Sequence, residues 1–148
     1  MCIRDSPSCD TDNTILDKYL TSGNMRALRL YLHGTNELTF QLSSSGSNNE
    51  SQLTTNASLA NDTWYHIAIT YSSGTWLVYK NGSSVSLDAA AFSTTTSIEQ
   101  NTQALRIGHS SDTKEPWDGE IDDLLIYEKV LTADEVKRNY NAGKRSHK

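Results

Sequence analysis

The residues that come nearest to a catalytic pair are the carboxylates Glu120 and Asp122, two positions apart. Alternate residues of a β-strand project from the same face, so a strand here would place both side chains together. Hydrolysis of a glycosidic bond uses two carboxyl groups that flank the bond, one of them as proton donor. Paired-carboxylate chemistry is therefore the first function to test against the rest of the chain.

Asp122 raises a second question, because alternation along residues 120–127 places it on the same face as Leu124 and Ile126. That apolar face should point inward, and a buried carboxylate without a partner is costly. Backbone N–H groups could satisfy it. A calcium ion could also do so, since calcium favours carboxylate and carbonyl oxygens. The residues alone leave both alternatives open.

Two tryptophans are the candidates for stacking on a sugar ring. Trp76 begins a strand on its less apolar face, and Trp117 ends a loop beside Pro116. A flat aromatic ring offers a large apolar face with a polar handle, which suits such contacts. Packing at the rim of the core is the alternative for both. Trp64 and His66 fit ordinary sheet positions.

The element that must position these residues is the stretch 63–82, TWYHIAITYSSGTWLVYKNG. It alternates with period two and is rich in β-branched and aromatic residues, which predicts two strands. A short turn containing Gly74 separates them. Asn81 and Gly82 form a strong turn signal, because both residues tolerate positive φ. The sequence therefore predicts an antiparallel hairpin at the centre of a sheet.

Other segments continue the all-β pattern. A single helix is predicted over residues 131–140, with Thr132 as N-cap, Glu135 completing a capping box, and Leu131 and Val136 as a hydrophobic staple. Gly143 is the expected left-handed C-cap. The remaining strands are expected at residues 14–19, 27–32, 37–42, 85–87, 104–109 and 120–127, with a weak edge strand within 53–59 and long polar loops at 43–50, 88–103 and 110–117.

The length of 148 residues fits one domain, and the net charge of −5 argues against nucleic acid or an anionic membrane as a partner. No apolar run is long enough to insert into a membrane. Residues 1–13 show no periodicity and are expected to be disordered or non-native, since MCIRDS resembles a translated sequencing-adapter remnant. The domain is expected over residues 14–143, followed by a basic tail at 144–148.

Five motifs in a fixed order resemble the laminin-G-like jelly rolls of the concanavalin A-like lectin/glucanase class. They are DTWYHIA (62–68), YKNG (79–82), LRIG (105–108), GEIDDLLIY (119–127) and LTADEV (131–136). The resemblance implies an antiparallel two-sheet β-sandwich with one short C-terminal helix. The strands that normally precede residue 14 in such domains, with their Asp-Gly motif, are not found. That departure predicts a truncated domain whose incomplete sheet has unprotected edges.

The resemblance also bears on chemistry. Related sandwiches often hold a structural calcium ion through the aspartate that matches Asp122, so a calcium site is expected there. Glycosidases of the class carry a second glutamate two or three positions after the aspartate. Leu124 and Leu125 occupy those positions here, and Glu128 is too far along. The strand therefore lacks the residues of a retaining hydrolase, and the chain is not expected to be an enzyme.

These observations favour a non-catalytic carbohydrate-binding or adhesion module of a larger secreted or cell-surface protein. Its partner would be a glycan or an extracellular protein, and the module would be monomeric within a longer chain. Trp76 and Trp117 are the expected sugar-binding residues, and Asp122 the expected calcium ligand. Two alternatives remain: a structural spacer without its own ligand, or an accessory part of a polysaccharide-degrading enzyme whose catalytic residues lie outside this fragment.

Overall fold

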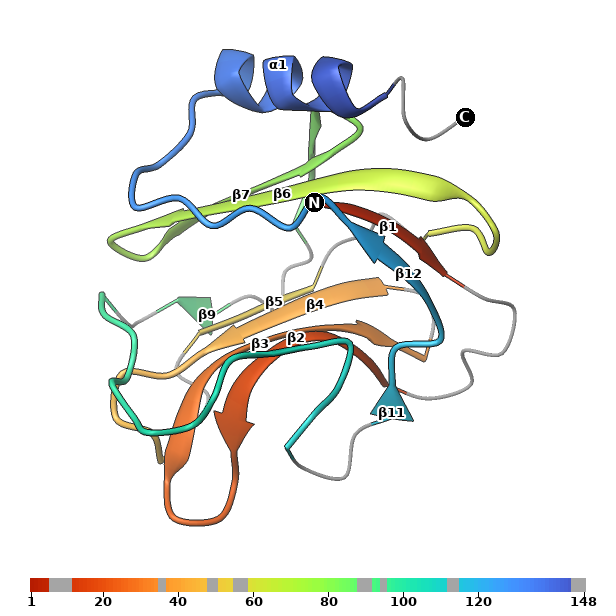
Figure 1. Ribbon diagram of the computed structural model, residues 1–148. Coiled ribbons are helices and arrows are strands. Elements are labelled where there is room, and N and C mark those ends of the chain that lie inside the picture. Colours follow the sequence, from red (N-terminus) through yellow and green to blue (C-terminus); the bar gives the residue numbers. More distant parts are fainter. Residues whose placement is uncertain are drawn as a thin grey trace.

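The computed structural model describes residues 1–5, 12–34, 37–47, 51–54, 59–87, 92–93, 96–111 and 115–144. The described strands form two layers, and a helix lies against the outer side of one of them (Figure 1). The expectation of a two-sheet sandwich with a short C-terminal helix is confirmed. The predictions for residues 6–11, and for most of the basic tail, lie outside the described residues.

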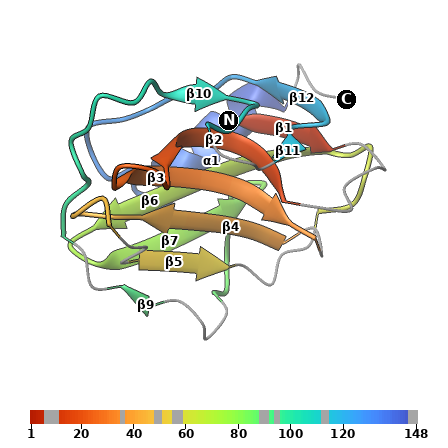
Figure 2. The same ribbon diagram turned by 90° about the horizontal axis from the view of Figure 1, so that it is seen from below.

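The upper layer in Figure 1 is a five-stranded sheet in the order β12-β1-β6-β7-β8 among the described residues. The lower layer has seven described strands in the order β10-β2-β3-β4-β5-β9, with β11 paired parallel to β2 (Figure 2). The bounds are β1 Cys2–Asp5, β2 Asn13–Leu20, β3 Met25–His33, β4 Glu37–Leu42, β5 Ser51–Thr54, β6 Trp64–Ser72, β7 Thr75–Lys80, β8 Ser83–Val85, β9 Phe92–Ser93, β10 Arg106–Ile107, β11 Glu115–Pro116, β12 Gly119–Asp122 and the helix α1 Ala133–Gly143.

The β6–β7 hairpin forms as the alternation predicts, with Ile69 opposite Val78. Its turn places Ser73 and Gly74 at φ values of 46° and 86°. Two consecutive residues with positive φ match the right-handed twist of the flanking strands, which is why such turns connect hairpins. The core face of this hairpin carries Ile67 and Val78, both buried.

The second turn, at Asn81 and Gly82, also has positive φ at both residues, 52° and 76°. The Asn81 side chain accepts a hydrogen bond from the His66 N–H through Oδ1 at 2.9 Å. A Cβ on Gly82 would lie 2.9 Å from the Tyr140 ring. The turn therefore requires this glycine twice, for its backbone angle and for the close approach of α1.

The main core lies between the sheets. Ile3, Ile15, Leu30, Leu32, Leu38, Leu42, Leu59, Ile67, Trp76 and Val78 form one buried cluster. Side chains from both sheets meet here because alternate residues of each strand point inward. Burial of this apolar area is the main stabilising contribution to the sandwich.

A smaller cluster of Tyr79, Leu131 and Val136 lies between α1 and the outer face of the five-stranded sheet. The capping box of α1 is confirmed, because the Thr132 side chain accepts from the Glu135 N–H and the Glu135 side chain accepts from the Thr132 N–H. The predicted role of Gly143 is wrong. The helix extends through Gly143, and its C-cap is Lys144, whose φ of −55° is right-handed.

The largest correction concerns residues 1–13. Cys2–Asp5 is not disordered but forms β1, paired with β12 on one side and β6 on the other. Asn13 already belongs to β2. Hydrogen bonding to two neighbours stabilises a four-residue segment that has no periodicity of its own, so tertiary context outweighs local pattern.

Two other predicted strands are shorter than expected. The strand predicted over residues 104–109 is reduced to Arg106–Ile107, and Leu105 and Ile107 are 42% and 55% exposed rather than inward. Pairing with β2 on only one side explains this, since β10 is an edge strand. The strand predicted over residues 120–127 likewise ends at Asp122.

Candidate functional site

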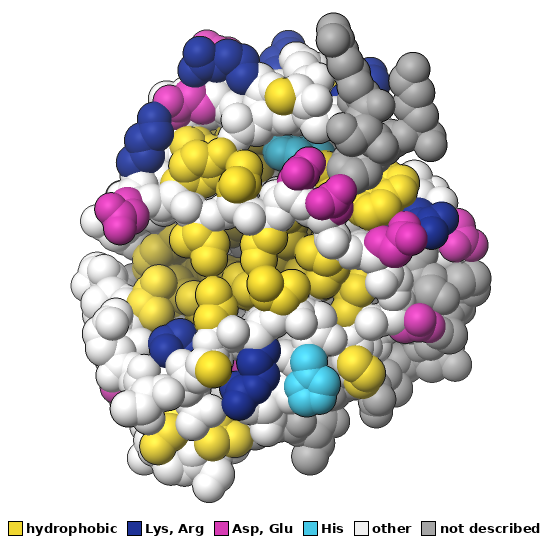
Figure 3. Space-filling view, viewed as in Figure 1, with side chains coloured by type: hydrophobic (Ala, Val, Ile, Leu, Met, Phe, Trp, Pro, Cys, Tyr) yellow, Lys and Arg dark blue, Asp and Glu magenta, His cyan; other side chains and the backbone are white. Residues whose placement is uncertain are grey.

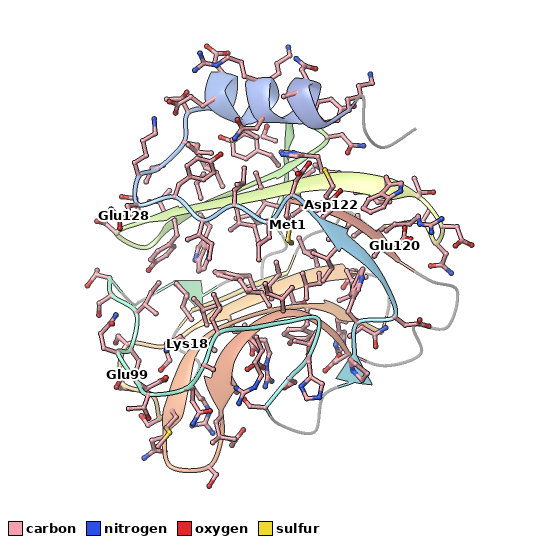
Figure 4. All side chains as sticks on the ribbon, in the orientation of Figure 1. Met1, Lys18, Glu99, Glu120, Asp122 and Glu128 are labelled. Carbon is pink, nitrogen blue, oxygen red and sulfur yellow. The ribbon has the colours of Figure 1, made fainter. Side chains whose placement is uncertain are left out.

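The two carboxylates singled out from the sequence lie on β12 (Figure 4). Asp122 is exposed, whereas Ile121 packs against the main core, so the predicted inward direction of Asp122 is wrong. The next residue, Asp123, has a φ of 51°. This left-handed residue ends the regular strand, so alternation counted back from Ile126 does not apply to Asp122.

Both carboxylates have structural partners. Glu120 forms an ion pair with Arg4 at 2.8 Å, and both side chains are substantially exposed. Asp122 accepts the Asp123 N–H through Oδ1 at 2.7 Å. An exposed glutamate held by an arginine on the neighbouring strand fits strand pairing rather than acid–base chemistry.

Asp122 and Asp123 are also the side chains to test for calcium. Within the described ranges, no group of three or more His, Cys, Asp or Glu side chains is placed to hold a metal ion. Calcium takes about six to eight oxygen ligands. The two adjacent carboxylates do not fit that requirement by themselves, so calcium at Asp122 remains a prediction from the resemblance.

Trp76 is not the exposed aromatic that its strand position suggested. It is 5% exposed and packs edge-on against Phe40, with ring centroids 4.9 Å apart, and against Tyr71 at 4.3 Å. The ring is therefore covered by core side chains and is not free to stack on a sugar. Stacking on a sugar would need an exposed face of the Trp76 ring, so the predicted role of Trp76 is not supported by this fold.

Trp117 is half-buried at the end of the loop, between β11 and β12. Its backbone N–H donates to the Gly108 carbonyl at 2.9 Å, and its indole lies against Gly119. The buried Nε1 atom has no hydrogen-bond partner among the described residues. The residue is partly exposed, so a sugar contact at Trp117 stays a prediction.

The sequence reasoning missed a set of polar side chains on the outer face of the seven-stranded sheet, here called the polar sheet face. Its members lie on β2, β3 and β4 and are all buried. Register places them in two cross-strand rows, one around Arg29 and one around Tyr31. The polar sheet face consists of Thr14, Asp17, Arg29, Tyr31, Thr39 and Gln41.

An ion pair anchors the first row. Asp17 and Arg29 are 0% and 3% exposed, and Oδ2 lies 3.0 Å from Nε. Ser110 donates to the same Asp17 oxygen at 2.9 Å. The Arg29 guanidinium also lies 3.9 Å from the centre of the Tyr19 ring. A buried charge pair is tolerated only with such additional partners.

Tyr31 anchors the second row and accepts a hydrogen bond from Gln41 Nε2 at 3.2 Å. Burial, with the nearby Asp12 charge as a second cause, raises the pKa of Tyr31 to about 12. The phenol therefore stays protonated and serves as a hydrogen-bonding group. The sequence did contain a signal: Arg29 and Tyr31 alternate with Leu28, Leu30 and Leu32. Nothing local showed that the polar set would be buried.

A second feature, here called the apolar cleft, opens between the two sheets beside β6 and encloses about 650 Å³. Figure 3 shows it as a hollow lined by hydrophobic side chains. Leu16, Leu30 and Phe40 line it from the lower sheet, and residues 123–131 form its outer wall.

The upper part of the cleft contains His66, which lies under α1 with its ring 5.8 Å from that of Tyr140. Burial lowers the pKa of His66 to about 4, and the amino group of Met1 adds to this effect. Among the described residues, the buried His66 Nδ1 atom has no hydrogen-bond partner. The imidazole is therefore neutral at physiological pH.

Several solved structures share this fold. A candidate carbohydrate-binding protein from Bacteroides ovatus superposes with a TM-score of 0.69 at 18% identity, covering 93% of this chain and 38% of that one. The sialidase CBM40 of Ruminococcus gnavus bound to α2,3-sialyllactose gives 0.67 at 18% identity, covering 94% and 80%. A pentraxin from Limulus polyphemus gives 0.59 at 22%, covering 92% and 66%. At these identities the likeness shows the fold.

No curated protein matches the sequence. In the described residues, no helix has the length and apolar character needed to span a membrane. The model of the Laminin_G_3 family, described as the concanavalin A-like lectin/glucanases superfamily, matches residues 6–137. That match covers most of the chain and agrees with both the motif order and the two-sheet sandwich, and the chain therefore belongs to the concanavalin A-like lectin/glucanase superfamily.

Proposed function

We propose that this domain is a non-catalytic carbohydrate-binding module of a larger secreted or cell-surface protein. The observation that carries the proposal is the exposed end of the polar sheet face, where the His33 side chain is 58% exposed and its Nδ1 lies 2.6 Å from Asp12 Oδ1. Planar polar groups and aromatic rings on a rigid sheet are suited to sugars, which present hydroxyls and apolar C–H faces. Two similar structures described as carbohydrate-binding or sugar-bound support it.

The accessible end of this face is the carboxyl end of β3. The His33 side chain is 58% exposed there, and Nδ1 lies 2.6 Å from Asp12 Oδ1. His33 lies opposite Glu37 on β4 and two residues from Tyr31. The inner rows are buried, and their charged and phenol groups are paired within the face, so we place the glycan at this end, where polar groups reach solvent.

The test is a glycan array on the whole chain, followed by calorimetry with the strongest binder. His33→Ala should weaken binding at least about tenfold if one well-formed polar contact is lost. Tyr31→Phe should weaken it less, because the Tyr31 hydroxyl is buried and accepts from Gln41 rather than facing solvent. Lys137→Ala, on the exposed side of α1, is the matched control and should bind as the parent does.

An array without any binder would contradict the carbohydrate-binding function. A binder that His33→Ala and Tyr31→Phe leave unchanged would contradict the location, and Trp117→Ala would then test the predicted loop contact. A folded His33→Ala protein, checked by its melting curve, is required for either conclusion.

One observation favours a second candidate, a structural spacer with no ligand of its own. Trp76, one of the two expected sugar-stacking residues, is buried in the core. If the domain is a spacer, no glycan on the array should bind to either the parent protein or the His33→Ala variant.

A further inference from the structure

The exposed end of the polar sheet face is a row of three side chains from neighbouring parts of the sheet. Asp12 directly precedes β2, and its Oδ1 lies 2.6 Å from Nδ1 of His33 at the end of β3. Glu37 begins β4 and lies opposite His33 in the register. Cross-strand neighbours share a face of the sheet. The imidazole of His33 therefore has an acidic residue on each side.

The charges of this row do not balance. Asp12 is paired with His33, whereas the half-buried Glu37 carboxylate makes no ion pair or side-chain hydrogen bond in the part of the chain that the structure describes. Arg29, on the same face, is buried and held by Asp17. Even with His33 protonated, one negative charge of the row is left over. Partial burial of Glu37 means that salt screens this charge less than that of a fully exposed group.

The row therefore favours a ligand with a positively charged donor. A carboxylate only accepts hydrogen bonds, and its strongest bonds are those from cationic donors. Because Nδ1 of His33 already contacts Asp12, Nε2 is the ring nitrogen left for a second polar group of the ligand. An anionic ligand would meet like charge at Glu37. Among the described residues, no group of His, Cys, Asp or Glu side chains is placed to hold a metal ion, and this row is included in that finding.

A second, independent observation lies one row further in. Thr14 lies opposite Tyr31 in the register, so its side chain shares the face that ends at His33. Thr14 is fully buried, and its Oγ1 has no hydrogen-bond partner within the described ranges. A buried hydroxyl without a partner costs free energy. A ligand rich in hydroxyl groups brings polar atoms toward this row, directly or through an ordered water molecule. The unused hydroxyl therefore favours a sugar over an amine that carries only its charge.

We propose that this end of the polar sheet face selects glycans with free amino groups, that is hexosamine units, over sugars that carry carboxylates. The inference rests on the proposed function, because it takes this end as the glycan site. The sugar ammonium group donates a charge-assisted hydrogen bond to Glu37, and a ring hydroxyl binds Nε2 of His33. Glu37 is thus the specificity-determining residue, whereas His33 contributes to the binding of any sugar.

The test compares three sugars that differ in charge, the tetramers of glucosamine, N-acetylglucosamine and galacturonic acid. Calorimetry on the whole chain at about pH 7, where an alkyl ammonium group is charged, gives their affinities. The glucosamine tetramer should bind at least about tenfold more tightly than its acetylated form, and the galacturonic acid tetramer more weakly than either. Raising the salt concentration from about 50 mM to about 500 mM should reduce the tenfold ratio, because salt screens the charges.

Variants assign the preference to Glu37. Glu37→Gln keeps the shape of the side chain and removes its charge, so it should bring the glucosamine and N-acetylglucosamine tetramers to within about threefold of each other. His33→Ala should weaken both tetramers. Glu120→Gln is the matched control, because Glu120 is an exposed carboxylate on the other sheet that is paired with Arg4, and it should keep the tenfold ratio. Melting curves show whether each variant is folded.

Equal binding of the glucosamine and N-acetylglucosamine tetramers, or a preference that Glu37→Gln leaves intact, would overturn the inference. Spermidine that binds as tightly as the glucosamine tetramer, with the same dependence on Glu37, would overturn the assignment to a sugar. If a neutral or acidic glycan binds through His33 and the glucosamine tetramer does not, the selection of amino sugars is wrong while the carbohydrate-binding function stands. If no glycan binds, the proposed function fails as well.

Discussion

β3 separates two regions of different character. On one side Arg29 and Tyr31 belong to the polar sheet face, and on the other Leu28 and Leu30 line the apolar cleft. Arg29 pairs with Asp17, and Tyr31 accepts from Gln41, whereas Leu28 and Leu30 border the space of the cleft. One face of β3 therefore carries paired polar side chains, whereas the other borders an open cleft. The polar side should lose more stability when one partner is removed.

The largest expected effect breaks the polar side. Arg29→Met leaves Asp17 buried without its ionic partner and should lower the free energy of unfolding by about 3–5 kcal/mol. Arg4→Met is the matched control, because its partner Glu120 is exposed, and should lower it by less than about 1 kcal/mol. Urea unfolding measures both. Equal losses in the two variants would show that the Asp17 pair contributes no more than a surface pair.

The next prediction compares leucines of β3 that differ in their relation to the cleft. Leu32 is fully buried away from the cleft, and Leu30 is buried but lines it. Leu32→Ala should cost about 4 kcal/mol because it leaves an enclosed void. Leu30→Ala should cost about 1 kcal/mol less, since it only enlarges an existing space. Identical urea midpoints would show that the cleft is closed in solution.

The pH dependence tests the upper side of the cleft. The pKa of His66 is about 4 in the folded protein, against 6.5 for an unperturbed histidine side chain. Between these values the unfolded chain binds a proton that the folded chain does not, so stability should fall as pH decreases from about 6.5 toward 4. Replacing His66 by Gln should flatten this part of the melting-midpoint profile. His109→Gln, at an exposed position, is the control and should keep the slope.

A smaller effect is expected at the start of α1, which covers the upper side of the cleft. Thr132→Ala removes the side-chain acceptor of the Glu135 N–H and should cost about 1 kcal/mol. Thr132→Ser keeps that acceptor and should cost much less. If the two variants have the same urea midpoint, the cap contributes nothing to the docking of α1.

The smallest effect is expected from calcium. Addition of about millimolar calcium after EDTA treatment should raise the melting midpoint slightly if the ion site that the family resemblance implies is present, because an ion that binds only the folded state stabilises it. Asp122→Ala should abolish that rise, and an unchanged midpoint in the parent protein would contradict the site.

Local sequence was a good guide where local interactions decide the structure. The capping box needs only Thr132 and Glu135, and the β6–β7 turn needs residues that tolerate positive φ. Both could be predicted because their interactions join residues close together in the chain. The order of family motifs gave the sandwich for a related reason, since each motif marks one strand or turn.

The errors arose where distant contacts decide. β1 exists because β6 and β12 flank it, and no pattern within Cys2–Asp5 reports those neighbours. The left-handed Asp123 shifts the alternation that made Asp122 look buried. For Trp76, alternation separated two faces of β7 correctly but could not tell which one Phe40 would cover.

The candidate site was missed for the same reason. Alternation does show that Arg29 and Tyr31 share a face of β3, but their burial depends on Ser110 and on neighbouring strands far along the chain.

The turn at Asn81 and Gly82 has a consequence for how the protein ages. An asparagine followed by glycine loses its side-chain amide readily when the glycine nitrogen attacks the side-chain carbonyl carbon. Here Oδ1 is held by the His66 N–H, and Tyr140 closes over Gly82. Deamidation at this position should therefore be slow while α1 is docked and fast once it detaches. The extent of deamidation at Asn81 in a stored sample should therefore increase with the time that α1 spends detached from the sheet.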